Sequence, residues 1–198
     1  MPAKPRRPYR QVARAEATER TREALLAAAD EEFTIDGFTR ASLEAVADRA
    51  GVTKQTALRH FGSKHGLIEA LLGRTSELVE RERAKAAPGD VRGAVRALVR
   101  HYENWGEGVL RMLAEEHRVR IVHHVADHGR EVHRDWVLRT FEPQLAPLVP
   151  SARRRRVAQL VAVCDVYTWK LLRQDMAMEV AETEAALVEL LERLLAGA

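Results

Sequence analysis

The stretch AGVTKQTALRHFGSKHGL, residues 50–67, decides the fold of the N-terminal part of the chain. It contains a glycine, then a short predicted helix rich in hydrogen-bonding side chains, then a second break at Gly62 and Ser63. A core helix would not expose so many polar groups, and a merely solvated helix would not need two breaks so close together. The stretch therefore predicts a short helix that enters a groove of DNA.

The residues before Gly51 predict a second short helix, so that the two form a helix-turn-helix. Ser42 is a good N-cap for this helix, and Thr53 is a good N-cap for the helix Lys54 to His60. Gly51 permits the sharp turn between them, in a left-handed backbone conformation. One face of the first helix is apolar and is formed by Leu43, Val46, Ala47 and Ala50.

The side chains of the second helix suit contact with base edges and phosphates. Gln55 can pair with adenine, Lys54 and Arg59 can bind guanine or phosphate, and the Thr56 methyl can touch thymine. Backbone N–H groups near Ser42 and Lys64, where helices begin, can hold phosphates. The spacing alone leaves an ordinary helical corner as the alternative. The candidate DNA-binding residues are Ser42, Thr53, Lys54, Gln55, Thr56, Arg59, His60 and Lys64.

The distribution of charge supports a polyanionic partner at this end of the chain. Residues 1–22 carry seven Lys or Arg against two Glu, a net +5, and residues 37–66 carry a net +3. Residues 23–36 carry −5, and residues 67–198 balance at 20 basic and 20 acidic residues. A solvated basic tail is one alternative. A non-specific architectural DNA-binding protein is another, but it predicts basic charge spread along the whole chain.

Hydrophobic periodicity predicts an all-α protein of about nine helices. Prolines at positions 2, 5 and 8 predict an extended N-terminal segment over residues 1–10. We expect three parts: a basic arm (1–17), a three-helix helix-turn-helix domain (18–75), and a C-terminal helical ligand-binding and dimerisation domain (76–198). The expected helices cover residues 18–36, 43–50, 54–60, 64–85, 91–105, 109–127, 130–148, 151–173 and 181–196, with breaks at Gly37, Gly106, Gly108 and Gly129, among others.

Residues 21–72 resemble the TetR-type transcriptional repressors. The first helix ends in the pattern Phe33, Gly37, Phe38, and the pattern Ala-Gly-Val-Thr covers residues 50–53. The pattern Phe-x-Ser-Lys-x-x-Leu covers residues 61–67. The resemblance implies a dimer that binds an inverted-repeat operator and leaves it when a small-molecule effector binds. One departure is Leu58, which stands where the family usually has a phosphate-binding Tyr. His60 and the arm with Tyr9 and Arg10 are possible substitutes.

The resemblance also implies a homodimer built from the last two long helices, 151–173 and 181–196. Both segments are apolar over a wide arc, which predicts burial of two faces, one in the core and one against a partner subunit. Leu187 and Leu191 are among these apolar positions. Apolar residues at helical spacing are more often plain core than pocket lining, and core is the alternative for the apolar members of this set. The expected ligand-binding residues are Trp105, Met112, Leu113, His117, Ile121, His124, Val125, Trp136 and Phe141.

Other functions have less support in the sequence. Five histidines fall between His117 and His133, so a helical metal sensor or enzyme is an alternative, but solvated or pocket histidines fit the pattern better. We expect no catalytic residues, no cofactor and no bound metal. The single cysteine, Cys164, suits a reducing compartment, and no signal peptide or membrane-spanning run is evident, so we expect a cytoplasmic protein.

Overall fold

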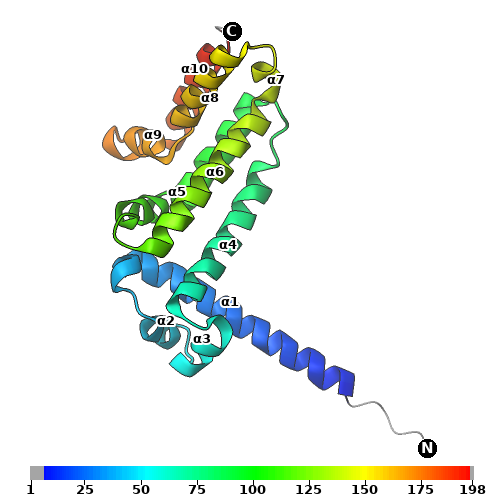
Figure 1. Ribbon diagram of the computed structural model, residues 1–198, viewed down its shortest axis with the longest axis vertical. Coiled ribbons are helices and arrows are strands. Elements are labelled where there is room, and N and C mark those ends of the chain that lie inside the picture. The colour runs from blue at the N-terminus through cyan, green and yellow to red at the C-terminus, as the bar shows by residue number, and fades with distance from the viewer. Residues whose placement is uncertain (1–6, 197–198) are drawn as a thin grey trace, which may run out of the picture. The chain divides into compact units, whose positions relative to one another are not determined.

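The computed structural model describes residues 7–196 of the chain (Figure 1). Within these residues it contains ten α-helices, one π-helical turn and no strand, which confirms the all-α prediction. The chain divides into two compact units, Met1–Gly73 and Arg74–Ala198. None of the described helices is both long enough and apolar enough to span a membrane.

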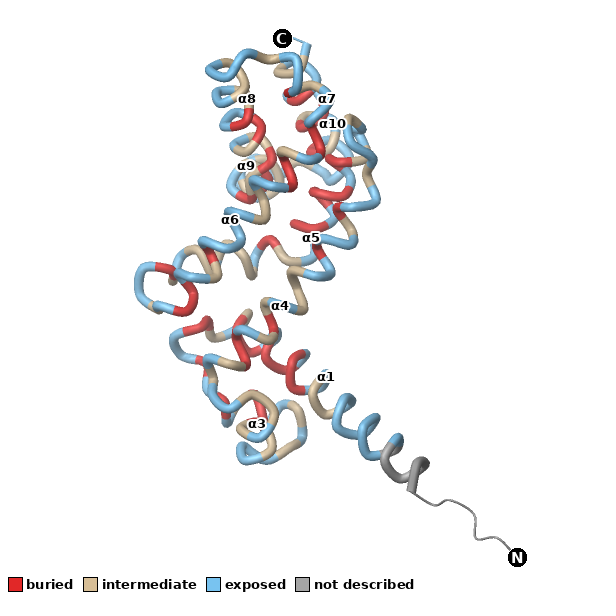
Figure 2. Tube along the Cα trace, turned by 45° about the vertical axis from the view of Figure 1, so that its right-hand side comes forward, coloured by how far each residue is buried: buried red, intermediate tan, exposed pale blue. Residues whose placement is uncertain are grey.

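The first unit contains α1 (Arg7–Arg40), α2 (Leu43–Arg49), α3 (Lys54–Phe61) and the beginning of α4 (Lys64–Arg83). Its core is formed by apolar side chains that recur at helical spacing. In Figure 2 the buried part of α1 lies next to the other helices of the unit, whereas its preceding turns are exposed. The fully buried apolar residues include Leu25, Leu26, Ala29, Val46, Ala47, Ala57, Leu67 and Ile68.

The sequence predicts the C-terminal end of α1 correctly but not its N-terminal end. The expected break at Gly37 is confirmed, since its φ of 74° and ψ of 169° interrupt the helix. The expectation that residues 1–10 are extended is wrong for residues 7–10, which are helical, while residues 1–6 lie outside the described part. Pro8 falls in the first turn of α1, where a helix needs no backbone N–H from it.

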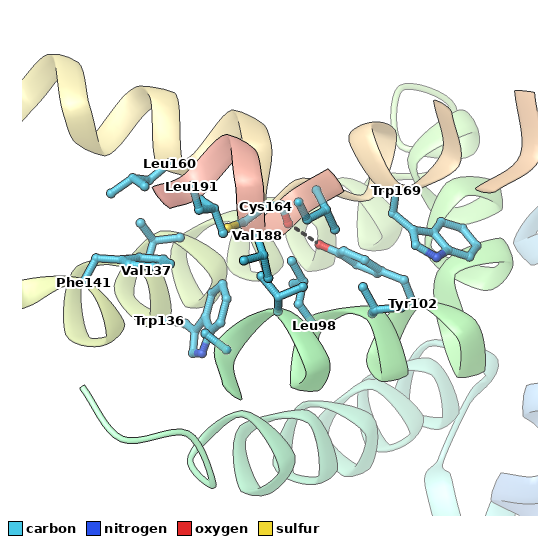
Figure 3. Close-up of a cluster of buried hydrophobic side chains, with 14 of the residues drawn as sticks. Leu98, Tyr102, Trp136, Val137, Phe141, Leu160, Cys164, Trp169, Val188 and Leu191 are labelled. Atoms are coloured by element: carbon cyan, nitrogen blue, oxygen red, sulfur yellow. Dashed lines mark hydrogen bonds between the residues drawn. The ribbon is translucent and has the colours of Figure 1, made fainter. Parts of the chain in front are cut away.

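The second unit packs its helices around one apolar core (Figure 3). The helix α10 packs against α5 and α8, and α5 packs against α6 and α9. The core includes Leu98, Val137, Phe141, Leu160 and Leu191. Its elements are α5 (Val91–Glu115), α6 (Arg120–Thr140), α7 (Glu142–Leu145), α8 (Pro150–Val163), α9 (Val166–Lys170), the π-helical η1 (Leu171–Asp175) and α10 (Val180–Ala196).

Several expected boundaries in this unit are wrong. The helix α5 continues through Gly106 and Gly108, and α6 continues through Gly129. The expected helix 151–173 is instead divided after Val163, because the Asp165 side chain accepts a hydrogen bond from the Tyr167 N–H and begins a new helix. A glycine inside a helix lowers its stability by about 1 kcal/mol relative to alanine. The packing of the rest of the helix contributes more than this, so the helix continues.

Gly106 has a packing reason for being a glycine. A Cβ atom built at this position would lie 2.5 Å from Cζ3 of Trp169, a ring that is only 5% exposed. Gly108, two residues further along α5, has no atom within 4 Å of the corresponding Cβ position. The helix α5 therefore passes close to Trp169 at Gly106 but faces open space at Gly108.

We predict opposite effects from two alanine substitutions in α5. Gly106→Ala should lower the free energy of unfolding of the second unit by about 1–3 kcal/mol, because the rigid indole must move. Gly108→Ala should raise it by about 0.5–1 kcal/mol, because alanine favours the helix and meets nothing. Urea unfolding followed by tryptophan fluorescence measures both, since all three tryptophans lie in this unit. Equal effects from the two substitutions would contradict this account of Gly106.

Candidate DNA-binding surface

The turn between α2 and α3 is held by backbone hydrogen bonds around Gly51. The Val52 N–H donates to the Ala47 carbonyl at 3.0 Å, and the Gly51 N–H donates to the Asp48 carbonyl at 3.1 Å. This pair of bonds closes a helix with its next residue in the left-handed region, and Gly51 has a φ of 69°. The left-handed turn at Gly51 is therefore confirmed, and it sets the direction in which α3 leaves α2.

Side-chain caps fix where the two short helices begin, as predicted. The Ser42 hydroxyl accepts a hydrogen bond from the Ala45 N–H at 3.0 Å. The Thr53 hydroxyl accepts one from the Thr56 N–H at 3.2 Å and lies 3.0 Å from the Thr56 hydroxyl. Each cap satisfies a backbone donor that the first helical turn leaves free.

The buried face of α3 is formed by a small side chain. Ala57 is the buried residue of this helix, and it is fully buried, as are Ala47 and Val46 of α2. Small side chains allow the two helices to approach closely. Lys54, Gln55 and Arg59 are exposed, so the polar residues predicted to read DNA share the outer surface of the helix.

The basic residues of this surface have polar neighbours from adjacent elements. The Lys54 ammonium lies 3.4 Å from a carboxylate oxygen of Glu44, and both side chains are largely exposed. The Lys64 ammonium donates to the Thr39 carbonyl at 3.4 Å. Both contacts are weak in solvent, and a phosphate can replace them. His60 is half-buried, with its ring centroid 6.0 Å from that of Phe61.

A further contact between α1 and α2 was not predicted from the sequence. The Arg49 guanidinium lies 3.1 Å from a carboxylate oxygen of Glu31 and 3.2 Å from one of Glu32, whose side chain is 6% exposed. These acidic residues belong to the segment with a net charge of −5, and Arg49 offsets part of that charge. The spacing of 17 and 18 residues along the chain carries no local signal by which the pairing could be found.

The predicted ligand-binding residues occupy different environments in the second unit. Trp136 and Phe141 are buried in the core with ring centroids 6.3 Å apart, and Ile121 is also buried. His117 and His124 are exposed, the His117 side chain by 82%. The structure therefore brings Trp136 and Phe141 together and turns these two histidines to solvent, and a role in ligand binding remains a prediction. The half-buried members are Trp105, Met112, Leu113 and Val125.

The histidines between His117 and His133 do not gather around a common point. Within the described part of the chain, no group of three or more His, Cys, Asp or Glu side chains is placed to hold a metal ion. His123 lies 3.3 Å from an Asp127 oxygen, and His128 lies 3.9 Å from a Glu131 oxygen. These two histidines pair with carboxylates along their own helix.

The first unit thus contains a helix-turn-helix, the arrangement in which a second helix can enter the major groove of DNA, and the second unit is a bundle of helices. Residues 25–71 match the family model described as bacterial regulatory proteins, tetR family. The chain thus has the DNA-binding domain of TetR-family transcriptional regulators, and the resemblance found in the motifs is confirmed. No curated protein matches the chain in sequence.

Solved structures share this fold across most of the chain. A transcriptional regulator from Rhodococcus sp. Rha1 is 19% identical, with a TM-score of 0.70, over 89% of this chain and 97% of its own. A TetR-family regulator from Streptomyces coelicolor A3 is 18% identical, with a TM-score of 0.54, over 90% of this chain and 96% of its own. SmeT, in a complex with triclosan, is 19% identical, with a TM-score of 0.61, over 89% of this chain and 90% of its own.

The cap of α3 gives a test of the local geometry. Thr53→Ala should lower the free energy of unfolding of the first unit by about 1 kcal/mol, because the Thr56 N–H loses its acceptor, whereas Thr53→Ser should keep the cap. Circular dichroism during urea unfolding follows the helices of both units, whereas tryptophan fluorescence follows only the second unit, so the difference between the two curves reports the first unit. If the alanine and serine variants unfold alike, the cap contributes nothing.

Proposed function

We propose that the protein is a dimeric transcriptional repressor that binds an inverted-repeat DNA operator through α3 and leaves it when a small-molecule effector binds the second unit. The observation that carries the proposal is the position of Lys54, Gln55 and Arg59 on the exposed face of a capped helix that follows a left-handed turn. A helix in this position enters the major groove with its N-terminal residues at base edges. We infer that the protein works by binding and not by catalysis.

The beginnings of α2 and α4 supply the phosphate contacts in this proposal. Ser42 and Lys64 lie in the first turns of helices or next to them, where free N–H groups and the helix dipole attract anions. Leu58 is half-buried and has no polar group, so a phosphate contact from its position is lost. We propose that His60 and the basic arm with Tyr9 and Arg10, whose side chains lie outside the described part of the structure, offset that loss.

Dimerisation is proposed through the last helices of the second unit. Several large apolar side chains are exposed on these neighbouring elements, and a second copy of the chain would cover them. Leu187 and Leu191, in contrast, are each only 1% exposed and belong to the core of the subunit itself. The exposed members are Tyr167, Leu171, Met176, Val180 and Leu190.

The proposal of an effector has support in the structural relatives. SmeT was solved in a complex with triclosan, a small molecule, and it shares the fold of this chain. We propose that the second unit binds an effector in a corresponding way, and that binding lowers the affinity of the dimer for DNA. The reciprocal effect follows from linkage, so that DNA lowers the affinity for the effector by the same factor.

Two substitutions separate base reading from phosphate binding. Gln55→Ala should cost about 1–3 kcal/mol on the sequence preferred in a selection from random duplexes, with little effect on scrambled DNA. Lys64→Gln should weaken binding to both DNAs and reduce the salt slope by about 0.9, because one phosphate contact is lost. Electrophoretic titrations at two salt concentrations measure both effects. Equal weakening of both DNAs by Gln55→Ala would show that Gln55 does not read a base.

The oligomeric state tests the proposed dimer surface. Leu190→Asp should weaken dimerisation by at least about tenfold, because a charge would be buried between the subunits. Leu78→Asp is the matched control, since Leu78 of α4 is exposed to a similar extent, 42% against 44%, and should leave the dimer intact. Sedimentation at micromolar concentration measures both. A monomeric wild-type protein would refute the dimer.

A further inference from the structure

A buried arginine lies at the end of α4 without an acidic partner. Arg83 is 6% exposed, and no carboxylate of the described residues lies within ion-pair distance of its guanidinium. One terminal nitrogen lies 3.4 Å from Nδ1 of His133, and the guanidinium carbon lies 4.8 Å from the ring centroid of Trp136. A buried charge is costly unless another charge or a full set of hydrogen bonds compensates it.

The groups around Arg83 do not compensate its charge. Burial, with the charge of Arg83 as the second cause, lowers the pKa of His101 to about 3 and that of His133 to about 4, although the Val161 carbonyl opposes the shift at His133. Both imidazoles are therefore neutral at pH 7. Burial also raises the pKa of the Cys164 thiol to about 12, so it carries no negative charge. The site thus has a net charge of +1.

Polar atoms in this site lack hydrogen-bond partners. We define the Arg83 cluster as Arg83, His101, His133 and Trp136, which come from α4, α5 and α6. The Arg83 Nε, the His101 Nδ1 and the Trp136 Nε1 are buried without a partner among the described residues. Buried polar groups are satisfied in the large majority of cases, so three such atoms around one cation require an explanation.

The known contacts of Arg83 satisfy it only in part. The stacking on Trp136, the contact with His133 and an interaction with the Tyr102 hydroxyl oxygen engage one face and only part of a group that has five N–H donors. In Figure 3 the indole nitrogen of Trp136 points away from the apolar side chains of Phe141, Leu160 and Leu191. The remaining donors therefore offer a place for an acceptor with negative charge.

We propose that the Arg83 cluster binds the carboxylate of an organic acid, which is the effector of this regulator. The inference rests on the proposed function and names the chemical class of its effector. A carboxylate matches the planar fork of a guanidinium with two parallel hydrogen bonds, and the Trp136 N–H can donate to it as well. Its single negative charge neutralises the site, whereas a dianion would leave a charge buried.

The surroundings of the cluster favour an acid with an apolar or aromatic body. The ring centroid of Trp105 lies 5.4 Å from that of His101, and the ring centroid of Tyr102 lies 5.0 Å from it. The Tyr102 hydroxyl is already engaged, since it donates to the Cys164 carbonyl at 2.9 Å (Figure 3). Aromatic surfaces with few free polar groups are typical of sites for small organic ligands.

The end of α4 gives such a ligand a route to the cluster. Arg83 is the last residue of the helix, and residues 84–90 form turns and irregular chain before α5. Gly89 ties the end of this segment to the bundle, since its N–H donates to the Thr140 carbonyl at 2.7 Å and its carbonyl accepts from Gln144 at 3.2 Å. Movement of residues 84–88 would leave these bonds and the helices intact, so it can open the cluster at lower cost than separation of packed helices.

The test measures the melting temperature of the full chain with a panel of organic acids and their amides. Benzoate, phenylacetate, octanoate and decanoate are each compared with the uncharged amide of the same carbon skeleton. At least one acid should raise the melting temperature of the wild type in a concentration-dependent manner, while its amide should not. A panel in which no acid acts, or in which acids and amides act alike, overturns the proposal.

Two arginine variants locate the effect. Arg83→Met keeps the apolar stem and removes the uncompensated charge, so its melting temperature without acid should equal or exceed that of the wild type, and the shift with acid should be lost. Arg81→Met, at an exposed position of the same helix, should keep the shift. A shift that persists in Arg83→Met, or a large loss of stability in that variant without acid, would assign Arg83 a purely structural role.

The failure of this proposal can be told apart from failure of the proposed function. The melting experiment uses no DNA, so acid binding without any DNA binding would leave the Arg83 cluster standing and remove the regulator. If the protein does bind DNA, Arg83→Met should bind the selected DNA as tightly as the wild type, because Arg83 takes no part in the proposed DNA contacts. The acid that stabilises the wild type should release DNA from it but not from Arg83→Met.

Discussion

The left-handed turn at Gly51 is the constraint on which the candidate DNA-binding surface depends. The bond from the Val52 N–H to the Ala47 carbonyl closes α2, and it places Thr53 where its hydroxyl can begin α3. Once the register of α3 is fixed, Ala57 faces inward and Lys54, Gln55 and Arg59 face outward. A residue with a Cβ at position 51 would meet no neighbour but would be strained at this φ, so the demand for glycine comes from the backbone alone.

The second unit combines an apolar core with a buried polar cluster around Arg83. The core needs only apolar side chains at helical spacing, and close packing of Trp169 against Gly106 ties α9 to α5. Trp136 of the Arg83 cluster packs in this core, but the cluster also leaves buried donors of Arg83 and Trp136 without partners, which lowers stability. Proteins tolerate such arrangements at binding sites, where a ligand supplies the missing partner.

The sequence predicts the first unit better than the second, for physical reasons. Caps and left-handed glycines act over a few residues, so Ser42, Gly51 and Thr53 could be assigned from local spacing. Gly106 and Gly129 carry the same local signal for a break, but tertiary packing keeps both inside helices. The break before Val166 depends on the cap by Asp165, a signal that the apolar run around it concealed. The Arg83 cluster joins residues up to 53 positions apart, and no local pattern reveals it.

The most direct test of the account uses the single native cysteine. Cys164 is buried, and its raised pKa keeps it protonated, so a cysteine introduced by Gln55→Cys can be labelled alone with an iron chelate that cleaves nearby DNA. If α3 lies in the major groove, we expect two clusters of cleavage in the selected DNA, related by two-fold symmetry and separated by about 10 bp or a multiple of it. The same label on Glu131→Cys, far along the sequence in the second unit, serves as the control. Cleavage from position 55 that is no stronger or more localised than from position 131 would contradict the claim that α3 lies in the groove.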